Sequence, residues 1–585
     1  MRQALAGQGA SRGIALGRAR LRIAHAADTR EQVIEHAQVE AEVARLHCAL
    51  DAARGELNAL RERLHGALAH ELGEFLDIHA LILDDPELLN GLDVLVRTGH
   101  YGAEYALKLQ RDKLVAVFEG MDDPYFRSRR EDIEHVVGRV RAALHRGTGE
   151  APAGIAGEIL VAESVGPAEL AQLQARGVTA IVTAGGSTLS HTAILARSLH
   201  MPLVVSAHEA LAQIDEGAAL MVDGSSGEVI CEPDAGDLRR FRVRRQELAR
   251  ERRGLQKLRR AETRTRDGVE IRLYANAESR QDVAQAHALG AAGIGLYRTE
   301  FLFLQRNQLP DEEEQFRAYR DLVLGMTGRP ATIRTLDLGA DKADGAGVAL
   351  ASEPNPALGL RGVRLSLARL PLFATQLRAI LRASGYGSLR ILVPMVSCRE
   401  EMVAVRALIA ELARELRTEG HEIADQFEIG AMIEVPAAAL ALAGLADQLD
   451  FISIGTNDLM QYTLAADRGN DAIAGLYSPL HPAFVRLLRE VIAVGGKHDL
   501  PVAVCGEMAG DARYTRLLLA LGLTDFSLHP STLLEVRQAV RESDLQALRR
   551  RARSLLRAKD RAQIERWMAW SKGEGKDREP VAGSR

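Results

Sequence analysis

Short apolar segments of strand length alternate with helix-forming segments over residues 268–542, and this alternation restricts the possible folds more than any other feature. Strands that are separated by helical stretches are typical of parallel sheets. The strand-like segments are residues 269–274, 292–297, 331–336, 389–396, 428–434, 451–455, 501–505 and 524–528. Eight such repeats predict a (β/α)8 barrel, whose binding site lies at the carboxyl ends of the strands.

Polar side chains stand at or just after the ends of five of these segments. They are Arg298, Arg334, Glu434, Asn457 with Asp458, and Cys505. Any one of them alone would more often be a salt-bridge partner, a helix cap or a packed thiol than a functional group. Because strand ends converge in a barrel, their shared placement favours a binding site.

The residue types at these ends indicate what the site would bind. Arginine forks bind phosphate and carboxylate groups through paired hydrogen bonds, so these arginines and Arg468 suit a small substrate that carries both groups. Glu434 and Asp458 supply the hard oxygen ligands that Mg²⁺ prefers. The thiol of Cys505 could transfer a proton, although an isolated cysteine is more often inert packing.

A second candidate site lies earlier in the chain, where an apolar run is followed by Gly185, Gly186, His191 and a helix-forming segment. Two glycines allow backbone N–H groups to approach an anion, and a helix N-terminus adds unpaired donors. His191 could then hold a phosphoryl group. Taken alone, the pattern is more typical of an ordinary loop.

The N-terminal part of the chain predicts an α/β domain with a helical insertion. Strand signals at residues 8–24 and again after residue 158 enclose a segment in which leucines recur at helical spacing. An acidic string runs through this segment, at Glu71, Glu74, Asp77, Asp84, Asp85 and Glu87. Such a string is usually a solvated face, but it could also receive a basic partner.

Residues 237–260 predict a basic helix, with eleven Arg or Lys from Arg239 to Arg260. A nucleic-acid partner is not favoured, since aromatic residues make up only 4% of the chain and the net charge is -5. A solvated linker helix is the better interpretation. The four widely spaced cysteines and the lack of a signal peptide or a long apolar run indicate a cytoplasmic protein without membrane insertion.

Several motifs together resemble enzyme I of the bacterial phosphotransferase system, the phosphoenolpyruvate-protein phosphotransferase family. They are GGSTLSHTAILAR at 185–197, LYRTEFLF at 296–303, IRTLDLG at 333–339, IGTNDL at 454–459, ADRGN at 466–470 and CGE at 505–507. The resemblance covers essentially the whole chain. It implies that phosphoenolpyruvate phosphorylates His191, which passes the group to the carrier protein HPr.

The resemblance also implies roles for individual residues. Phosphoenolpyruvate would be held by Arg298, Arg334, Asn457, Asp458, Arg468, Lys342 and Arg361, and magnesium by Glu434 and Asp458. Cys505 would protonate the enolate that remains after transfer. The helical insert would bind HPr, and the barrel would form a homodimer.

The same resemblance gives the expected domain organisation of this α/β multidomain chain. A swivelling phosphohistidine domain comprises residues 1–27 and 146–233, and the inserted helical domain comprises 28–145. A linker helix covers 234–265, the C-terminal (β/α)8 TIM barrel 266–575, and a tail 576–585.

Two alternatives share part of this chemistry. A dikinase-like phosphoenolpyruvate enzyme needs a large nucleotide-binding domain, for which neither a Gly-rich ATP loop nor spare length is present. A nitrogen-type regulatory enzyme I has the same chemistry and often carries an N-terminal sensory domain. No such domain is expected here, but a regulatory cascade without sugar transport remains an alternative. Three positions depart from the family pattern, namely Leu189, which is an extra residue in the histidine loop, Ala340 and Val435.

Overall fold

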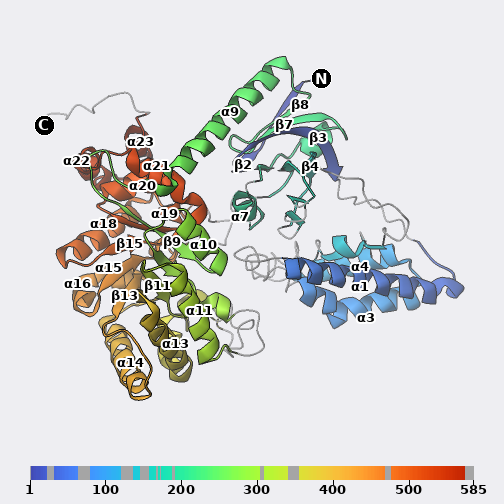
Figure 1. Cartoon of the computed structure of the whole chain (residues 1–585). Coiled ribbons are helices and arrows are strands. Elements are labelled where there is room, and N and C mark those ends of the chain that lie inside the picture. The colour runs from blue at the N-terminus through green and yellow to red at the C-terminus, as the bar shows by residue number, and fades with distance from the viewer. Residues whose placement is uncertain are drawn as a thin grey trace. The chain divides into compact units, whose positions relative to one another are not determined.

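The computed structural model describes the chain except for residues 1, 23–31, 64–78, 120–132, 134–135, 142, 145–156, 167–168, 171–172, 175, 187–190, 200, 304–308, 340–352, 354, 468–472, 474–475 and 574–585. The chain forms two compact units, Met1–Arg252 and Arg253–Arg585. Figure 1 shows helices and strands in both units. Each unit is described separately below.

The first unit contains an eight-stranded sheet in the order β1-β8-β7-β3-β4-β5-β6-β2. Its strands are β1 Gln3–Ala6, β2 Gln8–Ser11, β3 Ile14–Arg22, β4 Ile159–Ala162, β5 Ala180–Thr183, β6 Leu203–Val205, β7 Ala219–Asp223 and β8 Glu228–Cys231. Neighbours from β3 to β6 are parallel, and the outer pairs are antiparallel. The predicted strands are confirmed, whereas the edge strand β1 and its neighbour β8 were not predicted.

The described residues between β3 and β4 are mostly helical, as the leucine spacing predicts. Its helices include α1 Val39–Arg63, α3 Pro86–Arg97 and α4 Ala103–Glu119. Asp85 caps α3 by accepting a hydrogen bond from the backbone N–H of Glu87, and Pro86 occupies the first turn, where no N–H is needed. Leu46, Leu50 and Leu57 of the leucine stripe are buried. Leu64, Leu68 and Leu72 lie outside the described residues.

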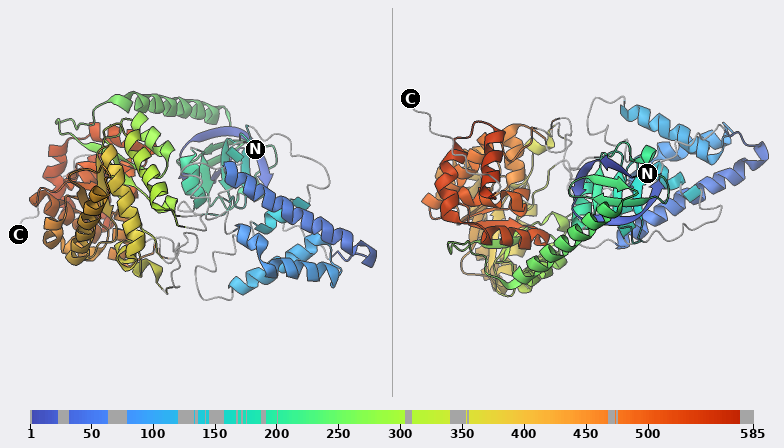
Figure 2. Two further views of the ribbon diagram at one scale, coloured as in Figure 1. Left: turned by 60° about the horizontal axis from the view of Figure 1, so that its bottom comes forward. Right: turned by 90° about the horizontal axis from the view of Figure 1, so that it is seen from above.

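The predicted basic helix is α9 Ala235–Lys257, which is followed by the 3-10 turn η2 Leu258–Arg260. Both views of Figure 2 show α9 as one uninterrupted helix. Its described side chains after Phe241 are mostly exposed, and the division between the two units falls inside it. A solvated connecting helix is therefore observed.

Both ends of α9 are held by charged side chains. At its start, buried Asp237 accepts hydrogen bonds from Arg2, with a 2.7 Å contact to Nε, and from Arg240. At its end, Arg537 donates to the carbonyls of Leu258 at 2.7 Å and Arg259 at 3.0 Å. Arg537 is 2% exposed and belongs to α21 Leu533–Arg541 of the second unit.

The second unit is built on a closed barrel of eight parallel strands, which confirms the predicted (β/α)8 fold. The strands are β9 Arg272–Ala277, β10 Ile294–Tyr297, β11 Ala331–Arg334, β12 Leu389–Val393, β13 Glu428–Ile433, β14 Phe451–Ile454, β15 Val502–Val504 and β16 Asp525–Leu528. The barrel closes where β16 pairs with β9. The first strand begins three residues later than predicted, because residues 264–270 form a turn closed by an isolated Arg264–Glu270 bridge.

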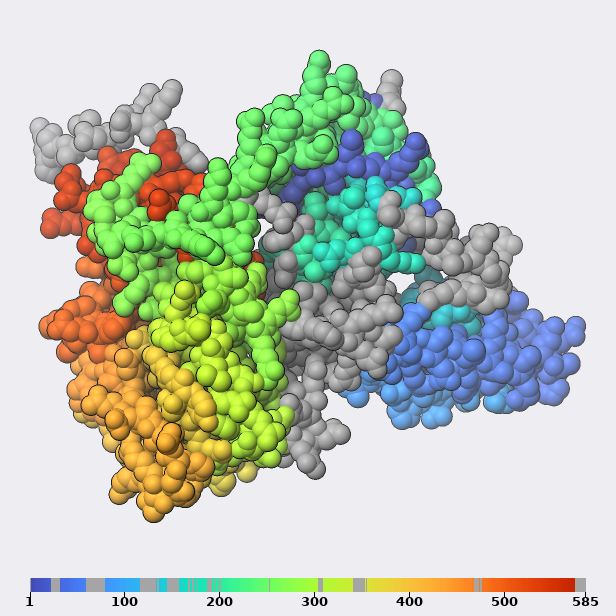
Figure 3. Space-filling model, in the orientation of Figure 1, coloured from blue at the N-terminus to red at the C-terminus, as the bar shows by residue number. Residues whose placement is uncertain are grey.

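Helices surround these strands and bury one large apolar core between the two layers. They are α10 Arg280–Ala288, α11 Glu312–Gly325, α12 Val363–Ala368, α13 Leu370–Ala383, α14 Arg399–Thr418, α15 Pro436–Leu440, α16 Leu442–Leu445, α17 Thr456–Leu464, α18 Pro482–Lys497, α19 Glu507–Gly510, α20 Ala512–Ala520, α21, α22 Leu545–Leu556 and α23 Arg561–Ser571. In Figure 3 these helices, coloured from yellow-green to red, form much of the visible surface of the second unit.

Candidate active site

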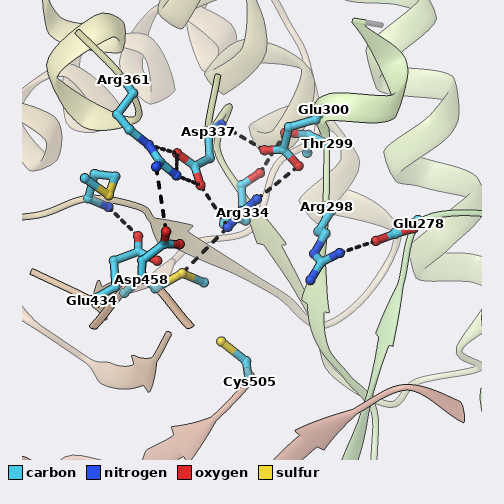
Figure 4. A network of polar contacts seen from close by, with 12 residues as sticks. Glu278, Arg298, Thr299, Glu300, Arg334, Asp337, Arg361, Glu434, Asp458 and Cys505 are labelled. Carbon is cyan, nitrogen blue, oxygen red and sulfur yellow. Dashed lines mark hydrogen bonds and ion pairs between the residues drawn. The ribbon is translucent and has the colours of Figure 1, made fainter. Parts of the chain in front are cut away.

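Arg334 is the last residue of β11, and its side chain is 11% exposed. Its Nη2 atom lies 3.1 Å from Glu300 Oε2, and its Nη1 atom lies 3.1 Å from Asp337 Oδ2. Asp337 and Glu300 also contact each other, since the backbone N–H of Asp337 donates to Glu300 Oε1 at 2.8 Å. Arg334 is therefore held between two buried carboxylates, as Figure 4 shows.

Asp337 is shared between Arg334 and a second arginine, Arg361. The Nη2 atom of Arg361 lies 3.1 Å from Asp337 Oδ2, and its Nη1 atom lies 3.7 Å from Asp458 Oδ1. The phenol oxygen of Tyr462 accepts a hydrogen bond from Arg361 Nη1 at 3.4 Å. Arg361 thus lies between the carboxylates of Asp337 and Asp458 (Figure 4).

The two arginines keep their charge in this environment. Burial alone would lower the pKa of Arg334, but the carboxylates of Glu300, Asp337 and Glu434 raise it above the ordinary arginine value. The same balance applies to Arg361, whose pKa is raised by Asp337 and Asp458 despite its burial. Both guanidinium groups therefore remain positively charged and can bind anionic groups.

Glu434 follows β13 and is 1% exposed. Its Oε1 atom accepts a hydrogen bond of 2.7 Å from the backbone N–H of Met395, and its Oε2 atom lies where a side chain at Gly455 would be, 2.6 Å from the position of a Cβ atom. Burial raises the pKa of Glu434 well above its usual value, and the nearby carboxylates of Asp337 and Asp458 raise it further. A cation at this corner would relieve the repulsion between these carboxylates.

Asn457 and Asp458 lie in the first turn of α17, directly after β14. The side chain of Asn457 makes a reciprocal pair with Glu507: its Nδ2 donates to Glu507 Oε1 at 3.3 Å, and its Oδ1 accepts from the backbone N–H of Glu507 at 3.2 Å. The backbone carbonyl of Asn457 also accepts a 3.0 Å hydrogen bond from Tyr477. This pairing fixes the orientation of the amide at the barrel end.

Cys505 follows β15 and is 3% exposed. Burial raises the pKa of its thiol to about 11, and the charge of Glu434 raises it as well. The carbonyl of Cys505 accepts a 3.1 Å hydrogen bond from Asn276 on β9. The neighbouring Gly506 is required for close packing, since a Cβ atom there would lie 1.9 Å from Thr456 Oγ1.

The structure brings Arg334, Arg361, Glu434 and Asp458 into one network, with Arg298, Asn457 and Cys505 at ends of strands in the same barrel. Arg298 is paired with Glu278, at 2.5 Å between Nη1 and Oε1. Lys342 and Arg468 lie outside the described residues. His191 is the first residue of α7 His191–Ser198, and the part of the loop with Leu189 lies outside the description.

Sequence reasoning assigned no role to four polar residues of this network, namely Glu278, Glu300, Asp337 and Tyr462. For two of them, the position in the sequence pointed to the site. Glu300 and Asp337 follow Arg298 and Arg334 by two and three residues within the same strand-end motifs. Their spacing alone could not reveal that Glu300 pairs with the arginine of the neighbouring strand.

Family models match most of the chain as three parts of phosphoenolpyruvate-utilising enzymes. The N-terminal domain model matches residues 6–129, the mobile domain model residues 154–227, and the phosphoenolpyruvate-binding domain model residues 252–545. The class of protein defined by the barrel and its arginine-carboxylate site is therefore that of the phosphoenolpyruvate-utilising enzymes.

Individual relatives define the family within this class. A phosphoenolpyruvate-protein phosphotransferase of Cupriavidus necator is 44% identical over 95% of this chain and 97% of its own length. The protein of the same name from Geobacillus stearothermophilus is 41% identical over 92% of each chain. The chain belongs to the phosphoenolpyruvate-protein phosphotransferase family.

A solved solution structure of an Enzyme I protein is also similar, with 27% identity, a TM-score of 0.33, and coverage of 42% of this chain and 99% of the other.

In the described part of the chain, no helix combines the length and the apolar character needed to cross a bilayer.

Proposed function

We propose that this protein transfers the phosphoryl group of phosphoenolpyruvate to its own His191 and then to a histidine of the carrier protein HPr. The observation that carries the proposal is the pair of arginines, Arg334 and Arg361, fixed beside an acidic corner at the carboxyl end of the barrel strands. Substrates with a phosphate and a carboxylate match paired guanidinium groups. The full-length similarity to proteins named phosphoenolpyruvate-protein phosphotransferase supports the same reaction.

We infer that Arg298, Arg334, Arg361, Asn457 and Asp458, together with Lys342 and Arg468, bind phosphoenolpyruvate. Arginine side chains spread the negative charge of the phosphoryl group during transfer, and fixed partners reduce the cost of orienting them. Glu300 and Asp337 supply such partners for Arg334. A nitrogen of His191 attacks phosphorus as the bond to the enol oxygen breaks, leaving the enolate of pyruvate.

Glu434 and Asp458 are our proposed ligands for Mg²⁺. Their chemistry fits, because both offer carboxylate oxygens and the crowding of Glu434 by Asp337 and Asp458 favours a cation. No group of three or more His, Cys, Asp or Glu with metal-site geometry occurs among the described residues, so substrate oxygens and water would complete the coordination. When bound, the ion supplies further positive charge to the phosphate oxygens.

The enolate requires a proton at carbon, and we infer that the thiol of Cys505 donates it. A proton donor must be protonated before the reaction, and a pKa of about 11 keeps this thiol neutral throughout the pH range from 6 to 9. The Cys505 thiolate formed after donation regains its proton from water.

Replacing Cys505 by Ala should lower the rate of phosphoenolpyruvate turnover by roughly 10²- to 10⁴-fold, the range for loss of a general acid. Binding of the substrate should change little, because no charge is removed. The rate would be measured by rapid quench with labelled phosphoenolpyruvate, and binding by equilibrium dialysis with an unreactive analogue. A wild-type turnover rate would remove Cys505 from proton transfer.

For HPr, we propose the helical segment within residues 28–145 as the docking surface. The acidic side chains there are partly engaged: Asp84 pairs with Arg54 at 2.8 Å, Asp85 caps α3, and Glu87 pairs with Lys113 at 3.2 Å. Glu71, Glu74 and Asp77 lie outside the described residues. Charge reversal at Asp84 tests docking more cleanly than reversal at Asp85, which would also remove a helix cap.

We further propose that the barrel forms a homodimer and that the protein works in the cytoplasm. Leu358, Leu440 and Leu476 of the barrel unit are 63%, 77% and 63% exposed, so each side chain is accessible to a second copy. A monomeric mass in sedimentation equilibrium at micromolar concentration would contradict the dimer.

The direct test of the proposed function is transfer of label. Purified protein incubated with ³²P-phosphoenolpyruvate and Mg²⁺ should acquire acid-labile, base-stable label, as expected for phosphohistidine. Addition of HPr from the same genome should move the label to HPr. Failure of the protein to take up label under these conditions would overturn the proposal.

A further inference from the structure

Arg361 occupies an unusual position in the site, because one of its two anionic partners is also a proposed metal ligand. Its guanidinium contacts Asp337 through Nε and Nη2, at 3.1 to 3.3 Å. Its remaining amino group, Nη1, lies 3.7 Å from Asp458 Oδ1. A cation is therefore already present beside the carboxylate that we propose for Mg²⁺.

The backbone on both sides of Arg361 is closely packed. Before it, Leu360 N–H donates to the Glu353 carboxylate at 3.1 Å. After it, Gly362 has a φ of 56°, and a Cβ atom there would lie 2.7 Å from the side chain of Met395. Met395 in turn donates its N–H to Glu434. The base of the Arg361 side chain is thus fixed relative to the acidic corner, while the end of this long side chain can change partners.

Electrostatic repulsion then predicts that Arg361 and a divalent cation compete for Asp458. A divalent cation bound by Asp458 and Glu434 would lie within a few ångströms of the Arg361 guanidinium, and the two like charges repel each other. An incoming phosphate offers Arg361 a new anionic partner. Once Arg361 turns toward that phosphate, Asp458 is available to the metal ion.

We propose that Arg361 is an internal counter-cation that competes with the divalent metal ion for Asp458 and is drawn away by the substrate phosphate. This inference rests on the proposed function, in which Asp458 binds Mg²⁺ and the site binds phosphoenolpyruvate. Metal and substrate then bind cooperatively, and by linkage each strengthens the binding of the other to the same degree. Arg361 sets the size of that coupling.

The test measures metal affinity rather than turnover. Mn²⁺ is titrated into the full-length protein and followed by electron paramagnetic resonance, with and without saturating 2-phosphoglycolate, an unreactive anion with one phosphate and one carboxylate. Without this anion, Arg361→Met should bind Mn²⁺ roughly tenfold more tightly than wild type, because a repelling unit charge has been removed. The gain in Mn²⁺ affinity caused by 2-phosphoglycolate should be smaller in the variant than in wild type.

Controls separate charge from structure. Arg361→Lys keeps the charge and should keep the weak wild-type affinity, whereas Arg361→Gln should behave like Arg361→Met. Arg298→Met removes an arginine whose carboxylate partner is Glu278, and should change Mn²⁺ affinity by less than about twofold. Thermal unfolding checks that each variant is folded. If only one of the neutral variants, Arg361→Met or Arg361→Gln, is folded, its Mn²⁺ affinity is the one compared with that of wild type.

Two results would overturn the inference in distinguishable ways. Unchanged or weaker Mn²⁺ binding by the folded neutral variants would show that Arg361 orients Asp458 instead of competing for it, and would leave the proposed metal site intact. If the Glu434→Gln variant binds Mn²⁺ with the same affinity as wild type, Glu434 is not a metal ligand. The proposed metal site, and this inference with it, would then be wrong.

Discussion

Replacing His191 by Ala should abolish phosphorylation of the protein by phosphoenolpyruvate, with a fall of at least about 10³-fold in the rate of label uptake, since the attacking nucleophile is lost. His191 is the first residue of α7. The buried side chains of this helix, Ala193, Leu195 and Ala196, are unchanged in the variant. We therefore expect the variant to be folded. Uptake of label is measured with ³²P-phosphoenolpyruvate and Mg²⁺.

The matched control is His208→Ala, which removes an exposed imidazole from the same unit. This variant should take up label at the wild-type rate and to the same stoichiometry. Stoichiometric label on the His191→Ala variant would show that another residue accepts the phosphoryl group. Equal loss in both variants would indicate damage to the fold.

Replacing Arg334 by Met should reduce kcat/KM for phosphoenolpyruvate by roughly 10³-fold or more, because a buried donor to the developing phosphoryl charge is removed. It should also destabilise the barrel unit by about 3–5 kcal/mol, since buried Glu300 loses its arginine partner and Asp337 loses one of its two. Activity is measured by label uptake and stability by urea unfolding.

Arg334→Lys distinguishes the two effects. A lysine keeps the positive charge between Glu300 and Asp337 but loses the planar fork, so most of the stability should return while activity stays low. As a comparison, Arg317→Met removes a largely exposed arginine that pairs with Glu313, and should change the free energy of unfolding by less than about 1 kcal/mol. Full activity of Arg334→Met would exclude Arg334 from substrate binding.

The barrel could be predicted from the sequence because the pattern that indicates it, a short apolar run followed by a helix-forming stretch, is local and is repeated along the chain. Each buried parallel strand is a short apolar run, and each polar residue after a run marks a strand end. The sequence alone therefore assigns Arg334 and Glu434 to the same end of the barrel. The first strand was placed three residues too early, since Val269 and Ile271 are apolar but lie at or beyond the turn that precedes β9.

What could not be predicted was how the polar groups pair. Asp337 forms ion pairs with Arg334, three residues away, and with Arg361, which belongs to a loop distant in the sequence. Glu300 follows one strand and pairs with the arginine at the end of the next. Such pairs depend on side-chain direction and on the closure of the barrel, neither of which is encoded in residue spacing. The raised pKa of Glu434 likewise results first from burial and then from the carboxylates of Asp337 and Asp458, all of which arise only on folding.

The edge strand β1 of the first sheet was missed for a different reason. β1 Gln3–Ala6 has a single buried residue, Leu5, and pairs with β8 Glu228–Cys231 near the other end of the unit. An edge strand of four residues carries too little apolar pattern to be distinguished from a loop.

The anchoring of α9 has a consequence for the order in which the chain can acquire its structure during synthesis. Arg537, which binds the carbonyls at the end of this helix, is made 279 residues after Leu258. The strands of the first sheet are complete at Cys231, and Arg2 is available to Asp237 as soon as that residue emerges. We therefore expect the first unit to fold on the ribosome while the far end of its connecting helix is still unanchored, and the barrel to secure that end only after its last strand has closed.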